Sequence, residues 1–267
     1  MKRALLYRRG GLGDTLLTFP VAEVLNRLGY QVVFLGHSDY LCLARHCGWA
    51  QAIYSSEFLN YFLSQPFEKK IIISLEGNLK PFPKERIWLP IYYLQSLGLP
   101  LDFSSKLPFS EYVPKDKRLA FIHPGSGSPK KNPPFSLFRK IERLLRDHQW
   151  DVLYIAGEAE KWLIGKVDNL LILRDTLSLA KTLAQGKIYV GNDSGVSHLA
   201  SFLGLKSFIF FGPSDELVFR PIGEKITIIS LPLSCRPCFP STCEERACLE
   251  EEALWEAFIE AFNREEN

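Results

Sequence analysis

The sequence predicts an α/β protein of two Rossmann-like halves, each built on a parallel sheet, and three observations predict this fold. Apolar strand patterns alternate with amphipathic helix patterns along most of the 267 residues. A glycine-rich turn joins the first strand to the first helix. Residues 102–117 contain polar and proline positions without a clear period, which is typical of a linker. We therefore expect two domains, over residues 1–112 and 113–267.

The first half opens with a βαβ pattern. A buried strand is predicted over residues 3–7, an amphipathic helix over 14–28 and a second strand over 31–35. A further strand is expected at 71–75. A helix is expected at 86–97, because Gly98 and Pro100 follow it as stop signals.

The second half shows the same alternation. Strands are predicted over 119–123, 151–156, 187–190 and 206–210, with helices over 135–148, 176–185 and 195–203. Such a series forms a parallel sheet, which binds its ligands at the carboxyl ends of the strands. A last helix is predicted over 250–262, with an apolar face formed by Leu254, Ala257, Phe258 and Ala261.

Composition is that of a globular protein, with 46% hydrophobic and 23% charged residues. No apolar run approaches the roughly 20 residues that span a bilayer. We therefore expect a protein that is neither exported nor membrane-spanning, and hence cytoplasmic.

The net charge of +2 is unevenly distributed. The first 118 residues hold 15 Lys and Arg against 10 Asp and Glu, whereas the remainder hold 17 against 20. Nine of those later acids lie between Glu244 and Glu266. A basic first half suits an anionic partner, although scattered solvated lysines would give the same excess.

The first candidate site is the turn from Arg9 to Thr15. It is no dinucleotide fingerprint, because Leu16 stands where the third glycine would be needed, and this disfavours an oxidoreductase. Gly11 and Gly13 let another molecule approach the backbone. Asp14 is the one carboxylate in the turn, and it can act either as a general base or as a helix cap.

The second candidate is the segment 123–132. Ser126, Lys130 and Lys131 offer a hydroxyl and two cations to a phosphate, although the segment lacks the spacing of a Walker loop. A solvated basic turn is the alternative interpretation.

The third candidate is the segment 190–198, where a strand ends in a polar turn that opens a helix. Free amides and the helix dipole at Asp193, Ser194 and Gly195 predict an anion site. His198 lies one turn inside the helix, where it either reaches the same anion or is an ordinary helical histidine.

Together, two phosphate-binding turns in one half and a glycine-and-carboxylate turn in the other predict a cleft enzyme. One side would hold a diphosphate donor and the other an acceptor. The sequence contains no Asp-x-Asp pair to carry a divalent cation, so lysines, helix dipoles and His198 would neutralise the phosphates.

Four of the six cysteines follow the spacing C-x2-C-x4-C-x4-C. They could hold a structural metal, stay reduced or form local disulfides, and the spacing differs from paired C-x2-C metal ribbons. We predict no metal site; the four residues are Cys235, Cys238, Cys243 and Cys248.

These segments, in this order, resemble glycosyltransferase family 9, which includes the lipopolysaccharide heptosyltransferases. The resemblance implies a GT-B fold, with two Rossmann-like domains whose parallel sheets face a central cleft. The segments that carry it are Gly13-Asp14-Thr15-Leu16-Leu17 with Pro20, His123-Pro124-Gly125-Ser126 with Lys130, Ala156-Gly157-Glu158, Gly191-Asn192-Asp193-Ser194-Gly195 with His198, Phe211-Gly212-Pro213-Ser214, and Cys235-x-x-Cys238.

The resemblance also implies a reaction. ADP-L-glycero-D-manno-heptose would be the donor, and an inverting, metal-independent transfer would deliver heptose to the lipopolysaccharide inner core, with no cofactor and no nucleic-acid partner. Asp14 would be the general base beside the acceptor-side residues Gly11 and Gly13. The second domain would bind the donor through Ser126, Lys130 or Lys131, Glu158, Asp193, Ser194, Gly195 and His198.

Two other classes of protein remain as alternatives: a non-catalytic nucleotide-sugar or carbohydrate binder, and a sugar-nucleotide epimerase of the same build. The segment 80–88 mixes cations with Phe82 and Trp88, which suits a peripheral contact with the cytoplasmic face of the inner membrane. A proline-rich loop whose aromatic residues pack into the core is the alternative there.

Overall fold

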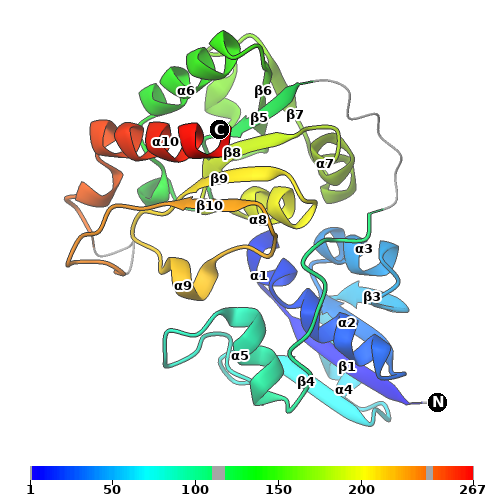
Figure 1. The fold of residues 1–267 in the computed structure, drawn as a ribbon. Helices are drawn as coiled ribbons and strands as arrows, with labels where there is room; N and C mark the ends of the chain where they lie inside the picture. Colours follow the sequence, from blue (N-terminus) through cyan, green and yellow to red (C-terminus); the bar gives the residue numbers. More distant parts are fainter. Residues whose placement is uncertain (1, 110–117, 239–242, 267) are drawn as a thin grey trace. The chain divides into compact units, whose positions relative to one another are not determined.

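A computed structural model describes residues 2–109, 118–238 and 243–266 and contains two compact units (Figure 1). Unit 1 comprises residues 1–109 and 175–177, and unit 2 comprises residues 110–174 and 178–267. The boundary that the sequence predicts at 112–113 lies outside the described residues. Each unit is an α/β structure with one parallel sheet.

Unit 1 contains a four-stranded parallel sheet in the order β3-β2-β1-β4. Its strands are β1 (Arg3–Arg8), β2 (Gln31–Gly36), β3 (Ala52–Ser55) and β4 (Lys69–Ile73). The helical segments are α1 (Leu12–Leu16), α2 (Phe19–Arg27), α3 (Ser38–His46), η1 (Ser56–Phe58), α4 (Leu59–Leu63) and α5 (Leu89–Ser96). Strand β1 is central, and five of its six residues are buried.

The predicted helix over 14–28 is wrong as one element, because the chain forms α1 and α2 instead. The break is at Leu17 and Thr18, which cap α1 and α2. Pro20 occupies the first turn of α2, where its missing N–H costs no hydrogen bond. The predicted strand at 71–75 begins two residues earlier, and the predicted helix at 86–97 begins at Leu89.

Unit 2 contains a six-stranded parallel sheet in the order β10-β9-β8-β5-β6-β7. Its strands are β5 (Leu119–His123), β6 (Asp151–Ala156), β7 (Leu170–Ile172), β8 (Ile188–Asn192), β9 (Lys206–Phe210) and β10 (Ile226–Ile229). The helical segments are η2 (Pro129–Lys131), α6 (Phe135–Asp147), η3 (Lys161–Leu163), α7 (Thr176–Leu183), α8 (Gly195–Phe202), α9 (Glu216–Phe219), η4 (Ala247–Leu249) and α10 (Glu251–Glu266).

The strand order of unit 2 is that of a doubly wound Rossmann sheet. Strands β5, β6 and β7 follow one another outward on one side of the sheet. Strands β8, β9 and β10 follow one another outward on the other side. The chain therefore reverses its winding between β5 and β8, and the loops after these two strands diverge there. In such sheets this switch point is where ligands bind.

The core of unit 2 is rich in phenylalanine. Phe208 and Phe210 from β9 meet Phe258 from α10, with ring centroids 5.4 and 6.1 Å apart. The apolar face predicted for the last helix is confirmed, because Leu254, Phe258 and Ala261 are fully or almost fully buried. Helix α10 packs beside α6 (Figure 1).

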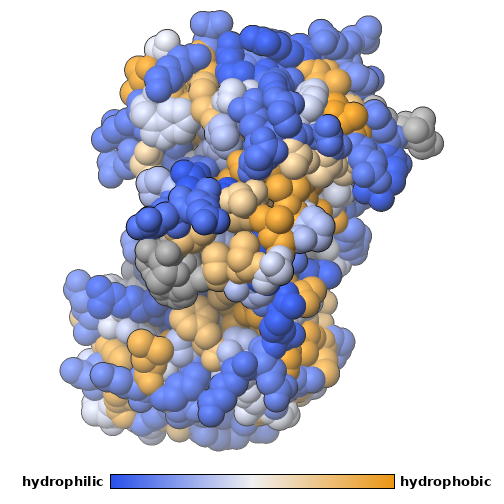
Figure 2. Space-filling model, turned by 90° about the vertical axis from the view of Figure 1, so that its left-hand side faces the viewer, coloured by the Kyte–Doolittle hydropathy of each residue, from blue (hydrophilic) through white to orange (hydrophobic). Residues whose placement is uncertain are grey.

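No helix in the described part of the chain is long and apolar enough to cross a membrane. On the face drawn in Figure 2, hydrophilic residues cover most of the surface of each unit, with smaller groups of hydrophobic residues between them.

Candidate functional site

The turn after β1 places Asp14 in the first turn of α1. Its Oδ2 accepts a hydrogen bond from the Gly11 N–H at 3.1 Å, so Asp14 caps the helix through its third position. Its Oδ1 accepts a hydrogen bond from Arg8 Nη2 at 2.7 Å. The Asp14 side chain is 31% exposed, so the carboxylate is held from within the protein while part of it faces solvent.

Gly10 is the sterically required glycine of this turn. A Cβ on Gly10 would lie 2.8 Å from the Asp14 Cβ, whereas one on Gly11 would meet only the Asp14 Oδ2 at 3.7 Å. Gly11 and Gly13 were predicted for the acceptor side because glycines let another molecule approach the backbone. Gly10 was missed because the clash that excludes a larger residue there comes from the Asp14 side chain, whose position the sequence does not show.

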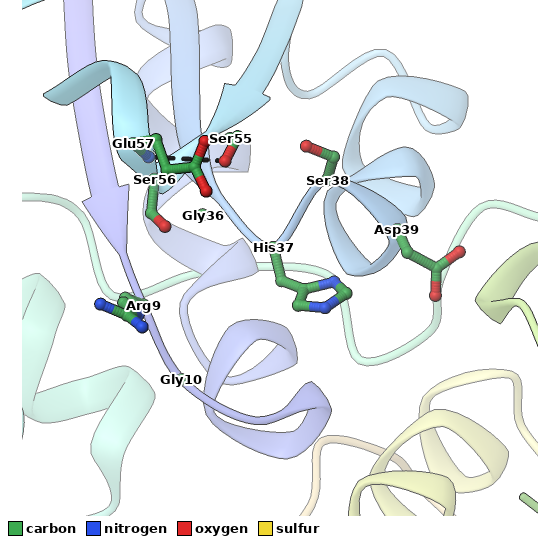
Figure 3. Close-up of a pocket in the computed structure, with 9 residues that line it drawn as sticks. All are labelled: Arg9, Gly10, Gly36, His37, Ser38, Asp39, Ser55, Ser56 and Glu57. Atoms are coloured by element: carbon green, nitrogen blue, oxygen red, sulfur yellow. Dashed lines mark hydrogen bonds between the residues drawn. The ribbon is translucent and has the colours of Figure 1, made fainter. Parts of the chain in front are cut away.

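A pocket of about 710 Å³ opens at the carboxyl ends of β1, β2 and β3 (Figure 3). Arg9 and Gly10 line it after β1, residues 36–39 line it after β2, and residues 55–57 line it after β3. The lining offers hydroxyl groups, carboxylates, a guanidinium and an imidazole (Figure 3). Such a mixture of short polar groups suits a polyhydroxylated ligand.

In unit 2, the loops after β5 and β8 are joined by one buried amide. Asn192 is fully buried, and its Nδ2 donates hydrogen bonds to Pro124 O at 2.7 Å and to Asn132 Oδ1 at 3.1 Å. Ser126 Oγ also donates to Asn132 Oδ1, at 2.6 Å. The structure therefore brings the second and third predicted segments together at the switch point.

The two lysines of the second segment differ in their surroundings. Lys131 Nζ forms an ion pair with Asp193 Oδ2 at 2.7 Å, while the Lys130 side chain is exposed. Asp193 is itself 7% exposed. Lys131 thereby links the loop after β5 to the turn that follows β8.

The amino terminus of α8 is formed as the sequence predicts. Ser194 is the N-cap, its Oγ accepts a hydrogen bond from the Ser197 N–H at 3.4 Å, and Gly195 is the first helical residue. The Ser194 hydroxyl also lies 3.4 Å from His123 Nδ1. His198 is buried, at 5% exposure, in the first turn of the helix.

A buried glutamate, Glu160, lies next to the end of β5. It is 5% exposed, its Oε2 lies 3.6 Å from His123 Nε2, and it accepts the Gly157 N–H at 2.9 Å. Glu158, which the sequence analysis selected, has a side chain that is 85% exposed and lies 3.9 Å from Lys161. Sequence reasoning missed Glu160 because nothing local distinguishes it from Glu158.

The pKa of Glu160 lies below its ordinary value. Burial alone would raise the pKa, but the neighbouring His123 imidazole and the hydrogen bond from the Gly157 N–H favour the ionised carboxylate more strongly. A Cβ on Gly125 would lie only 2.1 Å from Glu160 Oε1. Glycine at position 125 therefore leaves the space that Glu160 occupies.

All six cysteines are free thiols. In the described part of the chain, no group of three or more His, Cys, Asp or Glu residues is arranged to hold a metal ion. Next to Cys235, the Arg236 guanidinium donates a hydrogen bond to Gly212 O at 2.5 Å and pairs with Glu216 at 2.8 Å. Arg246 Nη2 donates to Asn132 O, so the segment that carries the last four cysteines contacts the loop after β5.

Comparison with known proteins identifies the family. A family model described as glycosyltransferase family 9 (heptosyltransferase) matches residues 92–249. The chain belongs to glycosyltransferase family 9. It is therefore a glycosyltransferase of the heptosyltransferase family, and the predicted membership is confirmed. The matched segment contains both switch-point loops of unit 2, whereas Asp14 lies before it.

Relatives and solved structures agree with family 9 membership. A lipooligosaccharide heptosyltransferase 2 from Campylobacter jejuni is 26% identical over 215 residues, which are 69% of this chain and 67% of the relative. The structure of Escherichia coli ADP-heptose LPS heptosyltransferase II is similar with a TM-score of 0.73 at 14% identity, and all of both chains is covered. The structure of the iron-containing dodecameric glycosyltransferase TibC from enterotoxigenic E. coli is similar with a TM-score of 0.75 at 14% identity. The match covers 100% of this chain and 77% of the TibC chain.

These similarities confirm the predicted GT-B fold for this family 9 chain. Each unit contains one parallel sheet, as the sequence predicts for two Rossmann-like halves.

Glu160 should stabilise the fold, and Glu158 should not. Replacing Glu160 with Gln removes a buried carboxylate that accepts the Gly157 N–H and lies beside His123, so the free energy of unfolding at pH 7 should fall by about 1.5 to 3 kcal/mol. The matched variant Glu158→Gln changes an exposed side chain and should leave the free energy of unfolding unchanged. Denaturant unfolding of both variants measures the difference.

The stability difference between wild type and Glu160→Gln should also depend on pH. Because the folded pKa of Glu160 is lowered, its contribution is complete above the ordinary value of 4.5 and is lost as the pH falls through the folded pKa. Equal unfolding energies for the two Gln variants at pH 7 would contradict this role of Glu160.

Proposed function

We propose that this enzyme transfers heptose from ADP-heptose to the inner core of lipopolysaccharide or lipooligosaccharide, inverting the anomeric configuration without a metal ion. The observation that carries the proposal is the switch point of unit 2, where Lys131, Asp193 and the amino terminus of α8 lie together. The solved heptosyltransferase named for ADP-heptose and the relative named for lipooligosaccharide support the choice of donor and acceptor.

The donor would bind to unit 2. The amides at Ser194 and Gly195 would receive a phosphate, because helix amino termini combine free N–H groups with a positive dipole. Lys131 would leave Asp193 for the diphosphate, and Ser126, Lys130 and His198 would complete the phosphate and sugar contacts. Glu158, on the exposed rim of the site, would bind donor hydroxyl groups.

Lysine substitution tests this donor site. Lys131→Ala should weaken ADP binding by about 1.5 to 3 kcal/mol, the usual contribution of a charge-assisted contact. Lys130→Ala is the comparison variant and should have the smaller effect, because the Lys130 side chain is exposed. Calorimetric titration with ADP measures both. Unchanged affinity in both variants would show that the diphosphate binds elsewhere.

The acceptor would bind to unit 1, in the pocket beside the Asp14 turn. Arg9 and His37 suit an anionic group on the acceptor sugar, and the serines and carboxylates of the lining suit its hydroxyl groups. Gly11 and Gly13 would keep the backbone accessible on the acceptor side. The basic excess of the first half of the sequence agrees with an anionic acceptor.

Asp14 would act as the general base. As the acceptor oxygen bonds to the anomeric carbon, Asp14 takes the hydroxyl proton. The bond from that carbon to the diphosphate breaks, and its electron pair leaves with ADP. Attack from the face opposite ADP inverts the anomeric centre. Asp14 would perform this chemistry in addition to capping α1.

Asp14→Asn separates the cap from the base. Asparagine is also a good helix-capping residue, so the variant should fold with only a small loss of stability. The turnover number should fall by roughly 10²- to 10⁴-fold, the usual contribution of general-base catalysis, while ADP affinity stays near wild type. Initial rates of heptose transfer and ADP titration measure the two effects.

Transfer by folded Asp14→Asn at within about threefold of the wild-type rate would reduce Asp14 to a cap. The base would then have to be another residue. The non-catalytic alternative, a nucleotide-sugar or carbohydrate binder, would instead be favoured by a wild-type protein that binds ADP-heptose and transfers no sugar.

Chelation tests the proposed metal independence. EDTA should leave heptose transfer unchanged, since lysines and helix amides supply the positive charge that the phosphates need. Complete loss that Mg²⁺ reverses would contradict the donor site as proposed. TibC is described as iron-containing, so a slow loss that only iron or zinc reverses would instead assign a structural metal to the four cysteines of residues 235–248.

We also propose a cytoplasmic location with a peripheral membrane contact at residues 80–88. Phe82 is 50% exposed, which suits the headgroup region of a membrane. Trp88 is half-buried and packs against Phe103 with ring centroids 5.6 Å apart, so Phe82 and the lysines of the segment would make the contact.

A further inference from the structure

We propose that Arg8 is a positioning residue for catalysis, which acts by holding the Asp14 carboxylate in place for proton transfer. The inference rests on the proposed role of Asp14 as the base. It adds a second residue to the machinery of unit 1, outside the motif that carries the family resemblance.

Arg8 is a buried cation at the end of the central strand. It is the last residue of β1, it pairs in register with Ile73 of β4, and it is 5% exposed. The backbone around it is tightly packed, because a Cβ on Gly36 of β2 would lie 2.5 Å from the Arg8 carbonyl oxygen. The backbone of Arg8 therefore lies in a closely packed part of the sheet.

The guanidinium is directed at Asp14. Arg8 Nη2 lies 2.7 Å from Asp14 Oδ1, and the Arg8 Cζ lies 5.9 Å from the centre of the Phe82 ring. Arg8 Nε is buried and has no hydrogen-bond partner among the described residues. Burying a charged group is costly unless it is well paired, and Asp14 is the carboxylate that pairs with this one.

Helix capping does not require this cation. The cap of α1 is complete when Asp14 Oδ2 accepts the Gly11 N–H, and an exposed cap carboxylate needs no buried partner. Arg8 instead engages the other oxygen and fixes the second contact of the carboxylate. The two contacts hold both carboxylate oxygens, while the Asp14 side chain remains 31% exposed to solvent.

A base held in one orientation loses little freedom when the acceptor hydroxyl arrives, so geometry contributes directly to the rate. Arg8 would therefore influence turnover through Asp14. Its effect should disappear when Asp14 can no longer accept the proton.

A double-mutant cycle tests this coupling. Arg8→Gln should lower the turnover number on the order of 10- to 100-fold in the wild-type background, within the full effect of losing a general base, and should leave the ADP affinity unchanged. In the Asp14→Asn background, the same substitution should change turnover by less than about threefold, because residues that act as a unit are not additive. Arg27→Gln, at an exposed ion pair with Asp102, is the matched control and should leave turnover unchanged.

Arg8→Lys keeps the charge and should recover part of the turnover lost in Arg8→Gln, because a lysine offers one contact without the planar fork. Additive losses in the cycle would overturn the inference, and so would an Arg8→Gln variant with wild-type turnover. If both Arg8 variants fail to fold while Asp14→Asn folds, Arg8 is a structural residue and the inference is likewise wrong. Wild-type rates in Asp14→Asn would instead overturn the proposed base itself.

Discussion

The carboxamide of Asn192 is the contact on which the switch point of unit 2 depends. It lies at the end of β8, fully buried, and ties the loop after β5 to its own strand end. The reversal of winding between β5 and β8 separates the loops above the sheet and creates space for a ligand. One buried amide keeps those loops from separating further, so Lys131 and Asp193 stay within 2.7 Å of each other. The cysteine-bearing segment adds a second support from outside through Arg246.

Unit 1 also contains a strand, a turn and a helix in succession at the ligand edge of its sheet. A parallel strand directs its last residue and the following turn toward the ligand edge of the sheet, and here that turn contains Asp14. The carboxylate caps a five-residue helix and pairs with a buried arginine. A side chain with two structural contacts is held in place, which would suit the proposed role of Asp14 toward a substrate hydroxyl.

Local patterns predicted the parts of the structure that depend on neighbouring residues. The alternating strands and helices, the capping position of Asp14 and the α8 turn with Ser194 could all be predicted from the sequence. The edge strands β3, β7 and β10 were missed, because segments of three or four residues carry too few alternations to show a period. Glu160 and Arg8 were missed for another reason: their importance comes from His123 and Asp14, and sequence patterning does not show which side chains a fold brings together.

The Lys131–Asp193 pair means that the ligand-free site carries its own counter-anion. Any phosphate that reaches Lys131 must displace a carboxylate that is already in place. A lone inorganic phosphate would gain one cation while leaving a buried acid unpaired, so the exchange brings little benefit. A larger ligand that also engages the helix amides and the surrounding hydroxyl groups can compensate for that loss. If Lys131 binds phosphate as proposed, the ion pair would disfavour small free anions and would favour molecules long enough to contact several loops at once.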